Sequence, residues 1–300
     1  MRLLTIIMFL LIGLPLHALE VQKVKENVYA IVGPLGQRTA DNFANNATFG
    51  VVVTSEGVVL IDTGGSWKGA ERLHATIREI TEQPVKFVIN TGGQDHRWIG
   101  NDYWQKQGAT VITSSAAVTD QKARVSVQMT GLSVLLGDAL QGTVPTYADI
   151  IFESEYEFAL GGESFEITFT GQAHTPGDVY VWVPSAKTVF TGDIVYTERI
   201  LGIGEQSSSR SWINVFKAVA ELNPLHIVPG HGRATTLERA TKDTYDYLVN
   251  LRSQMADYID AGGEIIDSVN VDQSAFSYLE NFDGLAKRNA QQVYSEMEWE

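Results

Sequence analysis

The pattern of apolar and polar positions divides the first part of the chain into short strands and one amphipathic helix. Residues 28–32, 47–54 and 58–61 are rich in Val, Ile and Phe, and the last two runs are joined by a Ser-Glu-Gly turn. Together these two runs predict a hairpin. Residues 67–81 follow with Leu, Ile and Ile on one helical face, which predicts an amphipathic helix.

Strands and helices then alternate. A strand ending at Asn90, a helix over 98–107 and a strand over 109–113 are predicted in turn, and such alternation indicates layered α and β elements. The section 116–148 fits helical periodicity only in parts, and we expect a helix followed by an irregular loop there. Short strands with turn signals return from Ile151 onward.

The C-terminal part of the chain has a helical pattern. A long helix is predicted over 238–261, and one or two more over 274–298. Since no low-complexity linker precedes this segment, we expect residues 238–300 to form a helical extension that packs on a main domain at 19–237.

The first residues resemble a secretory signal peptide. Arg2 is followed by an apolar run over 3–16 and then by Ala18, which predicts cleavage after residue 18 and a periplasmic or secreted protein with no membrane segment left. The alternative is an uncleaved anchor helix, although the run is short for a membrane span.

Charge and cysteine content narrow the possible partners. A formal net charge of −14 argues against a nucleic-acid or anionic-membrane partner and leaves a small molecule as the expected substrate. The chain has no cysteine, so disulfides, thiolate ligands and a cysteine nucleophile are all excluded.

Four clusters of His, Asp and Gly each follow a strand-like run. They lie at residues 92–96, 173–178, 191–193 and 229–232. The ends of strands can present rigid ligands to a shared cleft, so the clusters predict a metal site. The residues in them that can bind a metal are Asp95, His96, His174, Asp193 and His231.

The ordered set of clusters resembles the metallo-β-lactamase superfamily over about residues 28–233. This resemblance implies an α/β fold in which two β-sheets pack face to face between helices, an αββα sandwich. In the family motif, two spaced histidines precede Asp-His; here Thr91 and Gly93 stand at the positions of those histidines. Part of one half of the family's dinuclear site is therefore missing.

The phrase over residues 90–101 and the tail at 287–296 resemble a narrower branch, the exported SoxH-like and quinoprotein relay system zinc metallohydrolases. Membership of this branch would imply exported redox or sulfur-oxidation proteins as partners.

The resemblance also implies which ligands remain. One metal would be bound by Asp95, His96 and His231, with Asp193 as the residue that bridges to a second ion in the family. His174 with a share of Asp193 offers too few ligands to hold a second ion tightly, so one zinc is expected rather than two. Two imidazoles and a carboxylate also suit iron(II).

The predicted function is hydrolysis of a small thioester, ester or amide, with lactams among the candidate substrates, by metal-activated water. Asp95 is predicted to be either a ligand or the base that orients the water, and His174 is predicted to donate a hydrogen bond to the leaving group or the oxyanion unless it is vestigial. The alternatives are a mononuclear iron oxygenase acting on sulfur species and a non-catalytic binding protein of an exported redox relay.

Two further residues are linked to this site. Asp62 resembles a family residue that organises the metal-binding loops. Arg97 directly follows His96, where it either contacts an anionic substrate or simply begins a helix.

Overall fold

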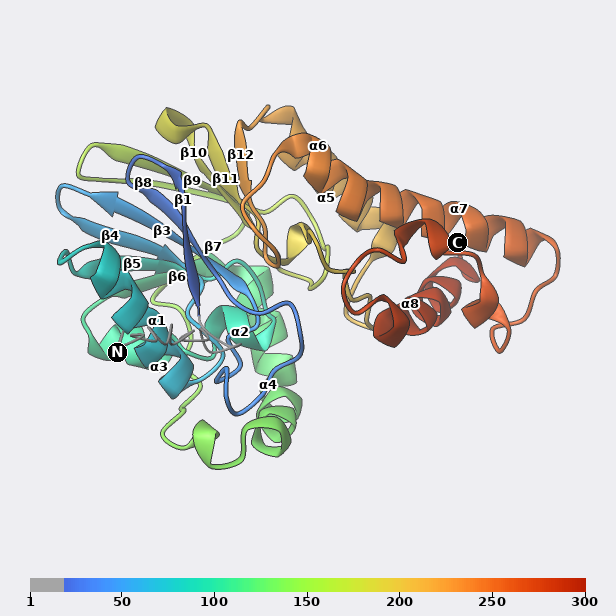
Figure 1. The fold of residues 1–300 in the computed structure, drawn as a ribbon, viewed down its shortest axis with the longest axis horizontal. Helices are drawn as coiled ribbons and strands as arrows, with labels where there is room; N and C mark the ends of the chain where they lie inside the picture. The colour runs from blue at the N-terminus through green and yellow to red at the C-terminus, as the bar shows by residue number, and fades with distance from the viewer. Residues whose placement is uncertain (1–18) are drawn as a thin grey trace, which may run out of the picture.

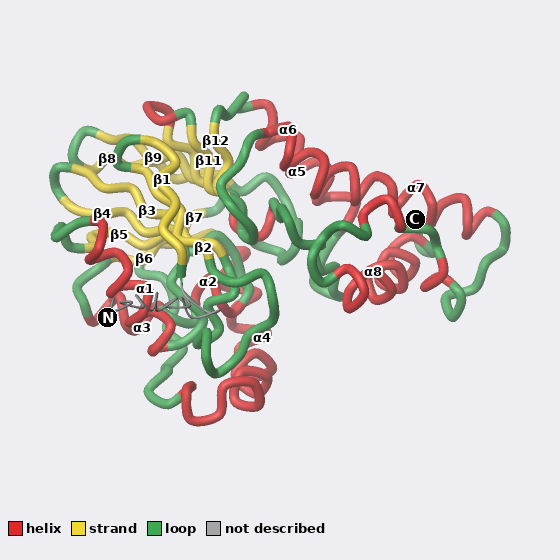
Figure 2. The backbone as a smooth tube through the Cα atoms, in the orientation of Figure 1, coloured by secondary structure: helices red, strands yellow, loops and turns green. Residues whose placement is uncertain are grey.

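Two β-sheets lie face to face with helices on their outer sides (Figures 1 and 2) in the computed structural model, which describes residues 19–300. The predicted αββα sandwich is therefore confirmed. The predicted signal peptide falls at residues 1–18, outside the described residues. Within residues 19–300, no helix is long and apolar enough to cross a membrane.

The first sheet has seven strands in the order β1-β2-β3-β4-β5-β6-β7, antiparallel as far as β4 and parallel from β4 to β7. Its strands are β1 (Glu20–Lys25), β2 (Val28–Val32), β3 (Thr48–Thr54), β4 (Gly57–Ile61), β5 (Val85–Ile89), β6 (Thr110–Ser114) and β7 (Ile150–Phe152).

The second sheet has five strands in the order β12-β11-β10-β9-β8, and only β11 and β12 are parallel. Its strands are β8 (Glu155–Leu160), β9 (Glu163–Thr168), β10 (Tyr180–Val183), β11 (Thr188–Phe190) and β12 (His226–Val228).

Alternating side chains of the first sheet supply two separate cores. In β4, Val59 and Ile61 face the second sheet and pack with residues such as Phe165 and Val181. The other face of β4 packs under the helices on the outside of the first sheet. This period of two is the reason that one short apolar strand can serve two layers.

The helices that cover the first sheet are α1 (Trp67–Ile80), α2 (Asp95–Trp98), α3 (Asn101–Lys106) and α4 (Ser115–Leu136). The helices on the other side are α5 (Ser209–Glu221), α6 (Leu237–Ala240), α7 (Asp246–Asp260) and α8 (Phe282–Met297). A π-helical turn at Thr241–Tyr245 makes α6 and α7 continuous, in agreement with the long helix expected over 238–261.

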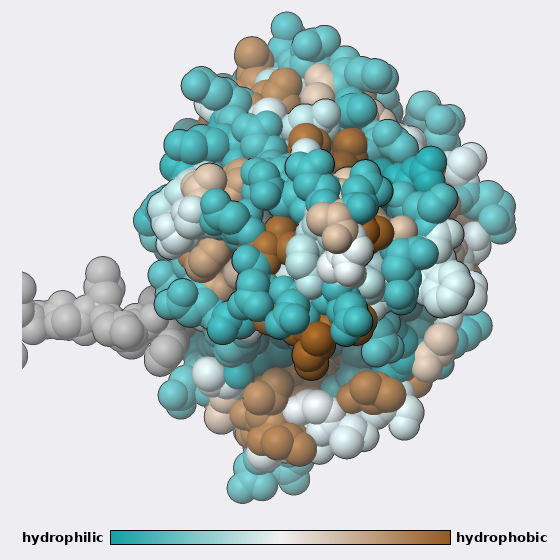
Figure 3. All heavy atoms as spheres, turned by 90° about the vertical axis from the view of Figure 1, so that its right-hand side faces the viewer, coloured by the Kyte–Doolittle hydropathy of each residue, from teal (hydrophilic) through white to brown (hydrophobic). Residues whose placement is uncertain are grey.

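The C-terminal helices share a core with the second sheet. One cluster of buried side chains joins Val189 of β11 and Trp212 of α5 to Leu251 of α7 and Val293 of α8. In Figure 1, α7 and α8 extend to one side of the sheets, and Figure 3 shows that the end face of this region is mostly hydrophilic with small apolar patches. The extension is therefore packed on the body through an apolar interface.

Candidate metal centre

Strand ends bring together three of the five residues predicted to bind a metal, and Asp95 and His174 lie outside this group. His96 lies in α2 after β5, Asp193 follows β11, and His231 follows β12. One ligand atom from each of these three residues lies within 4.8 Å of the others, and all three side chains are buried. The two rings are 5.2 Å apart and perpendicular, on either side of the Asp193 carboxylate.

The Nε2 atoms of the two rings point at this carboxylate. His96 Nε2 is 3.4 Å from Asp193 Oδ2, and His231 Nε2 is 3.3 Å from Asp193 Oδ1. His96 Nε2 is buried without a hydrogen-bond partner among the described residues. Two imidazoles, one of them with an unpartnered Nε2, and a carboxylate fit a divalent metal ion such as zinc or iron(II).

An arginine faces the other nitrogen of each ring. Arg38 Nη2 is 3.1 Å from His96 Nδ1, and Arg199 Nη1 is 3.2 Å from His231 Nδ1. Because a guanidinium has only donors, each Nδ1 accepts, and a neutral ring then carries its proton on Nε2. For a neutral ring to bind a metal through Nε2, that proton would have to move to Nδ1 and the arginine turn away, or the proton would have to be released to solvent. Most metal-binding histidines instead donate their second N–H to a carboxylate or carbonyl.

Asp95 lies beside the group but is bound to an arginine. Its Oδ1 accepts hydrogen bonds from Arg38 Nε at 2.9 Å and Arg38 Nη2 at 2.5 Å. Burial would raise the pKa of the Asp95 carboxyl, but Arg38 and His96 together hold that pKa well below its usual range. The carboxylate is a weak base, and its place as a ligand stays a prediction.

Arg97 is fully buried and neutralises two carboxylates, so it does not reach the substrate. Its Nη2 and Nε donate to Asp193 at 2.7 and 3.1 Å, and its Nη1 donates to Asp62 at 2.8 Å. Asp62 also accepts from the backbone N–H and the hydroxyl of Thr91. Asp62 therefore fixes the loop that begins the first cluster, which is the role expected for it.

His174 lies on the opposite side of the cavity from the ligand group. Its Nδ1 is 2.9 Å from the carbonyl oxygen of Gly202, and its Nε2 faces Gln94 at 3.3 Å. Burial lowers the pKa of the His174 imidazole to about 4, so the ring is neutral at pH 7. With Nδ1 donating to the carbonyl, Nε2 of the neutral ring carries the lone pair. The roles predicted for His174, as a hydrogen-bond donor in catalysis and as a metal ligand, stay predictions.

An ion pair from α4 fills the space beside Gly93, one of the two positions at which the family motif has a histidine. A Cβ atom added to Gly93 would lie 1.8 Å from Asp120 Oδ2, and Asp120 is paired with Arg124 one helical turn away. Gln128 donates to the carbonyl of Gly93 at 2.8 Å. Side chains of α4 thus occupy the space that a side chain at position 93 would need. Gly93 does not have a positive φ, so steric exclusion and not backbone strain opposes a histidine here.

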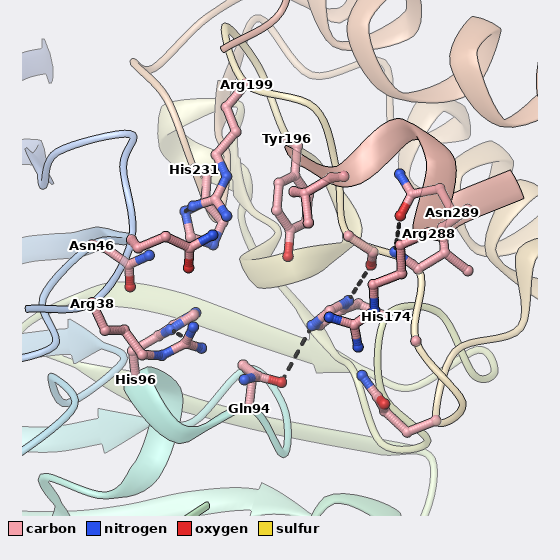
Figure 4. Close-up of a pocket in the computed structure, with 16 residues that line it drawn as sticks. Arg38, Asn46, Gln94, His96, His174, Tyr196, Arg199, His231, Arg288 and Asn289 are labelled. Atoms are coloured by element: carbon pink, nitrogen blue, oxygen red, sulfur yellow. Dashed lines mark hydrogen bonds between the residues drawn. The ribbon is translucent and has the colours of Figure 1, made fainter. Parts of the chain in front are cut away.

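A cavity of about 160 Å³ opens above the ligand group (Figure 4). It is smaller than the ~300–1,000 Å³ of drug-sized sites, which indicates a small ligand. Arg38 and Asn46 come from one side, and Arg288 and Asn289 of α8 come from the other. Gly202, Ile203, Gly204 and Gln206 also line it.

Sequence reasoning missed several lining residues. Tyr196 stacks on His231 with ring centroids 4.6 Å apart, and burial raises the pKa of its phenol well above the usual value, so the hydroxyl keeps its proton. The sequence feature that could have pointed to Tyr196 as a site residue is its position three residues after Asp193. Arg38, Arg199 and Arg288 are scattered along the sequence and follow no shared pattern.

Comparison with known proteins identifies the family. Residues 44–231 match the family model described as the metallo-beta-lactamase superfamily. A metallo-beta-lactamase type 2 from Elizabethkingia meningoseptica is 26% identical over 223 residues, which cover 71% of this chain and 78% of that protein. A second relative, metallo-beta-lactamase IND-1 from Chryseobacterium indologenes, is 24% identical and covers 69% of this chain and 80% of its own length.

Solved structures agree with this assignment. A metallo-beta-lactamase from Pontibacter korlensis superposes with a TM-score of 0.61 at 25% identity, covering 77% of this chain and 99% of that one. An inverting sec-alkylsulfatase from Pseudomonas sp. has the same fold over 93% of this chain and 50% of its own, with a TM-score of 0.70 at 14% identity.

The chain belongs to the metallo-β-lactamase superfamily and is a metal-dependent hydrolase of that superfamily. Its buried His96–Asp193–His231 group is consistent with the metal sites of zinc enzymes of this class.

Proposed function

We propose that the protein hydrolyses a small thioester, ester or amide, lactams included, at a single zinc ion held by His96, Asp193 and His231. The observation that carries this proposal is the convergence of these three buried side chains, of which His96 and His231 line a small cavity. Bound there, zinc would lower the pKa of a water molecule and polarise the substrate carbonyl.

The argument for one ion rests on the ion pair from α4. Asp120 and Arg124 occupy the space next to Gly93, and Thr91 is bound to Asp62. Neither family histidine is present to hold a second ion.

Two residues of the chain are proposed to handle protons and charge. His174 Nε2 accepts a proton from the attacking water and returns it to the leaving group, because a neutral imidazole can do both in turn. The Tyr196 hydroxyl, which stays protonated, donates a hydrogen bond to the developing oxyanion.

The decisive experiment measures metal and activity together. The purified chain should contain about one zinc, by the ligand-count argument, and should hydrolyse at least one compound in a screen of thioesters, lactams and lactones. His231→Ala should lose most of both, whereas His226→Ala, a histidine outside the cavity, should keep them. Full metal content in His231→Ala would refute the ligand assignment.

Metal analysis also tests the alternatives. The same donor set suits iron(II), so iron at full occupancy with oxygen uptake on sulfur compounds would replace the hydrolase proposal by an oxygenase. Absence of bound metal after reconstitution would favour the non-catalytic binding protein.

The assignment to the SoxH-like branch, with export and with redox or sulfur-oxidation partners, is also part of the proposal. It is supported by the sequence phrases at 90–101 and 287–296 and by the signal-like residues 1–18. N-terminal sequencing of the protein recovered from the periplasm or medium should begin at Leu19. A chain retained in the cytoplasm with Met1 intact would contradict it.

A further inference from the structure

The side chains that line the cavity carry an unusual charge. They include three arginines and three histidines but no aspartate or glutamate, in a chain with a net charge of −14. The acids of the site lie behind this lining, where Arg38 binds Asp95 and Arg97 binds Asp62 and Asp193. A positive cavity in an acidic protein attracts anions from solution.

Arg199 is the exception among the buried arginines of the site, because no carboxylate neutralises it. Its side chain lines the cavity and the residue is only 6% exposed, yet it forms no ion pair within residues 19–300. Its Nη1 contacts His231 Nδ1 and, at 3.5 Å, the carbonyl oxygen of Gly36. Its Nε is buried without a hydrogen-bond partner.

A buried charge without a partner is costly, and a buried donor without an acceptor adds to that cost. The protein nevertheless fixes Arg199 in this place. Its backbone pairs with that of Glu280: Ile200 donates its N–H to the carbonyl of Glu280 at 3.0 Å, and Glu280 donates its N–H to the carbonyl of Glu198 at 2.9 Å. An uncompensated guanidinium held at a cavity wall indicates that an anionic ligand completes its environment.

A second unpaired arginine comes from the C-terminal extension. Arg288 of α8 is exposed and lines the same cavity, and its side chain makes no hydrogen bond or ion pair in the part of the chain that the structure describes. Asn46, on the opposite side, has a buried Oδ1 that lacks a donor. The cavity therefore offers cationic donors at two places and one acceptor.

We propose that Arg199 and Arg288 bind an oxyanion of the substrate, such as a carboxylate, sulfonate or phosphate, while the scissile acyl group lies at the His96–Asp193–His231 group. This inference rests on the proposed hydrolase function and names its substrate class: a small acyl compound with an anionic group and, next to it, an N–H or O–H for Asn46. The extension thus supplies part of the substrate site.

The test is calorimetric titration of the zinc-loaded full chain with succinate, methanesulfonate and inorganic phosphate, which together distinguish the three oxyanions. At least one should bind. Arg288→Gln should weaken that binding about five- to tenfold, since a charge-assisted contact is lost. Lys287→Gln is the matched control: it removes the same charge from the neighbouring exposed position on α8, outside the cavity, and should change binding less than about twofold.

Arg199→Gln should weaken binding by about tenfold or more. Its zinc content and thermal midpoint are measured alongside, because Arg199 also contacts His231; the Arg288 variant keeps the test decisive if Arg199→Gln loses its metal. Absence of binding by all three anions at about 10 mM, roughly ten-thousandfold above a dissociation constant of 1 μM, would overturn the proposal. Equal binding by wild type and Arg288→Gln would do so as well.

Measurements of turnover test the anion site separately from the proposed hydrolase function. A pair of thioesters that differ only in a neutral or a carboxylated acyl tail should show a lower KM for the carboxylated compound, and the difference should shrink in Arg288→Gln. Hydrolysis of both with equal KM would refute the anion site and leave the hydrolase standing. Anion binding that depends on Arg288, without hydrolysis of either thioester, would support the anion site and refute the proposed acyl hydrolysis.

Discussion

Arg97 directly follows His96 of the candidate metal centre, where the sequence left two interpretations open. Its guanidinium is fully buried and pairs with both Asp62 and Asp193. It therefore stabilises a candidate metal ligand, Asp193, and the residue that fixes the first cluster's loop, Asp62. The residue type alone could not decide this, because the two carboxylates that bind it come from distant strand ends. Their buried positions make the arginine a structural requirement.

Replacing Arg97 by Met is expected to destabilise the fold by about 3–5 kcal/mol, because two buried carboxylates lose their partner. Urea unfolding followed by circular dichroism measures this change. Arg78→Met is the matched control: Arg78 is paired with Glu82 at the surface, and the loss there should stay below about 1 kcal/mol. Equal costs for the two variants would show that the buried pairs contribute nothing special.

Gly93 is where the missing family histidine would lie. Gly93→His together with Thr91→His is expected to give no second zinc and to destabilise the protein by about 1–3 kcal/mol, since the new side chain meets Asp120. Adding Asp120→Ala and Arg124→Ala removes the obstacle and should raise the metal content towards two ions. Metal analysis of each variant checks both statements.

The control for this series is the Asp120→Ala, Arg124→Ala pair alone, which should keep one ion. A second ion in the histidine variant that retains Asp120 and Arg124 would contradict the steric argument. Failure of the combined, folded variant to gain an ion would mean that ligand number is not what limits the site.

At the scale of elements, the sequence predicted most strands and the amphipathic helices well, because period-two and period-3.6 patterns directly reflect which face is buried. α4 was harder. Its inner face carries Asp120, Gln121 and Gln128, which are buried against the loop at residues 92–93. A helix that buries polar side chains has no apolar stripe to read, so its packing was not predictable from periodicity.

α8 holds the rim of the cavity through Asn289. This side chain accepts from the N–H of Ile203 at 2.9 Å and donates to the carbonyl of Leu201 at 2.8 Å. The carbonyl of Gly202, between these two residues, in turn binds His174. A residue of the extension therefore fixes the backbone that orients a predicted catalytic histidine.

Asn289→Ala should lower the free energy of unfolding by about 1–3 kcal/mol, because buried backbone groups lose their partners. It should also reduce kcat more than Lys287→Gln does, as the Gly202 carbonyl is released. Asn270→Ala, at an exposed position of the extension, is the stability control. Unchanged unfolding in Asn289→Ala would disprove the anchoring role.

The whole molecule should unfold as one unit. Trp212 of the body and Leu251 and Val293 of the extension share one core, so tryptophan fluorescence and far-UV circular dichroism should report coincident transitions in urea. A chain ending at residue 237 should fail to give a soluble folded protein, since that core would be exposed. Two separated transitions in the full chain would instead indicate an independently stable extension.

The candidate site was only partly predictable at this scale. The predicted ligands His96, Asp193 and His231 are recognisable because each sits in a short cluster after a strand. The cavity wall is different: Arg38, Arg199 and Arg288 come from three distant parts of the chain, and only the folded arrangement brings them to one surface. Ligands are encoded locally, whereas the charge of a cavity is a property of the assembled chain.

The ion pair that fills the space beside Gly93 also bears on how this protein can change by descent. If the site holds one ion as proposed, binding a second would require histidines at positions 91 and 93 and the loss of Asp120 and Arg124. A histidine introduced first collides with the pair, and removal of the pair first leaves a hole next to the loop. Each single substitution is therefore expected to lower stability before a second ion can bind, so the Asp120–Arg124 pair disfavours a stepwise gain of a two-metal site.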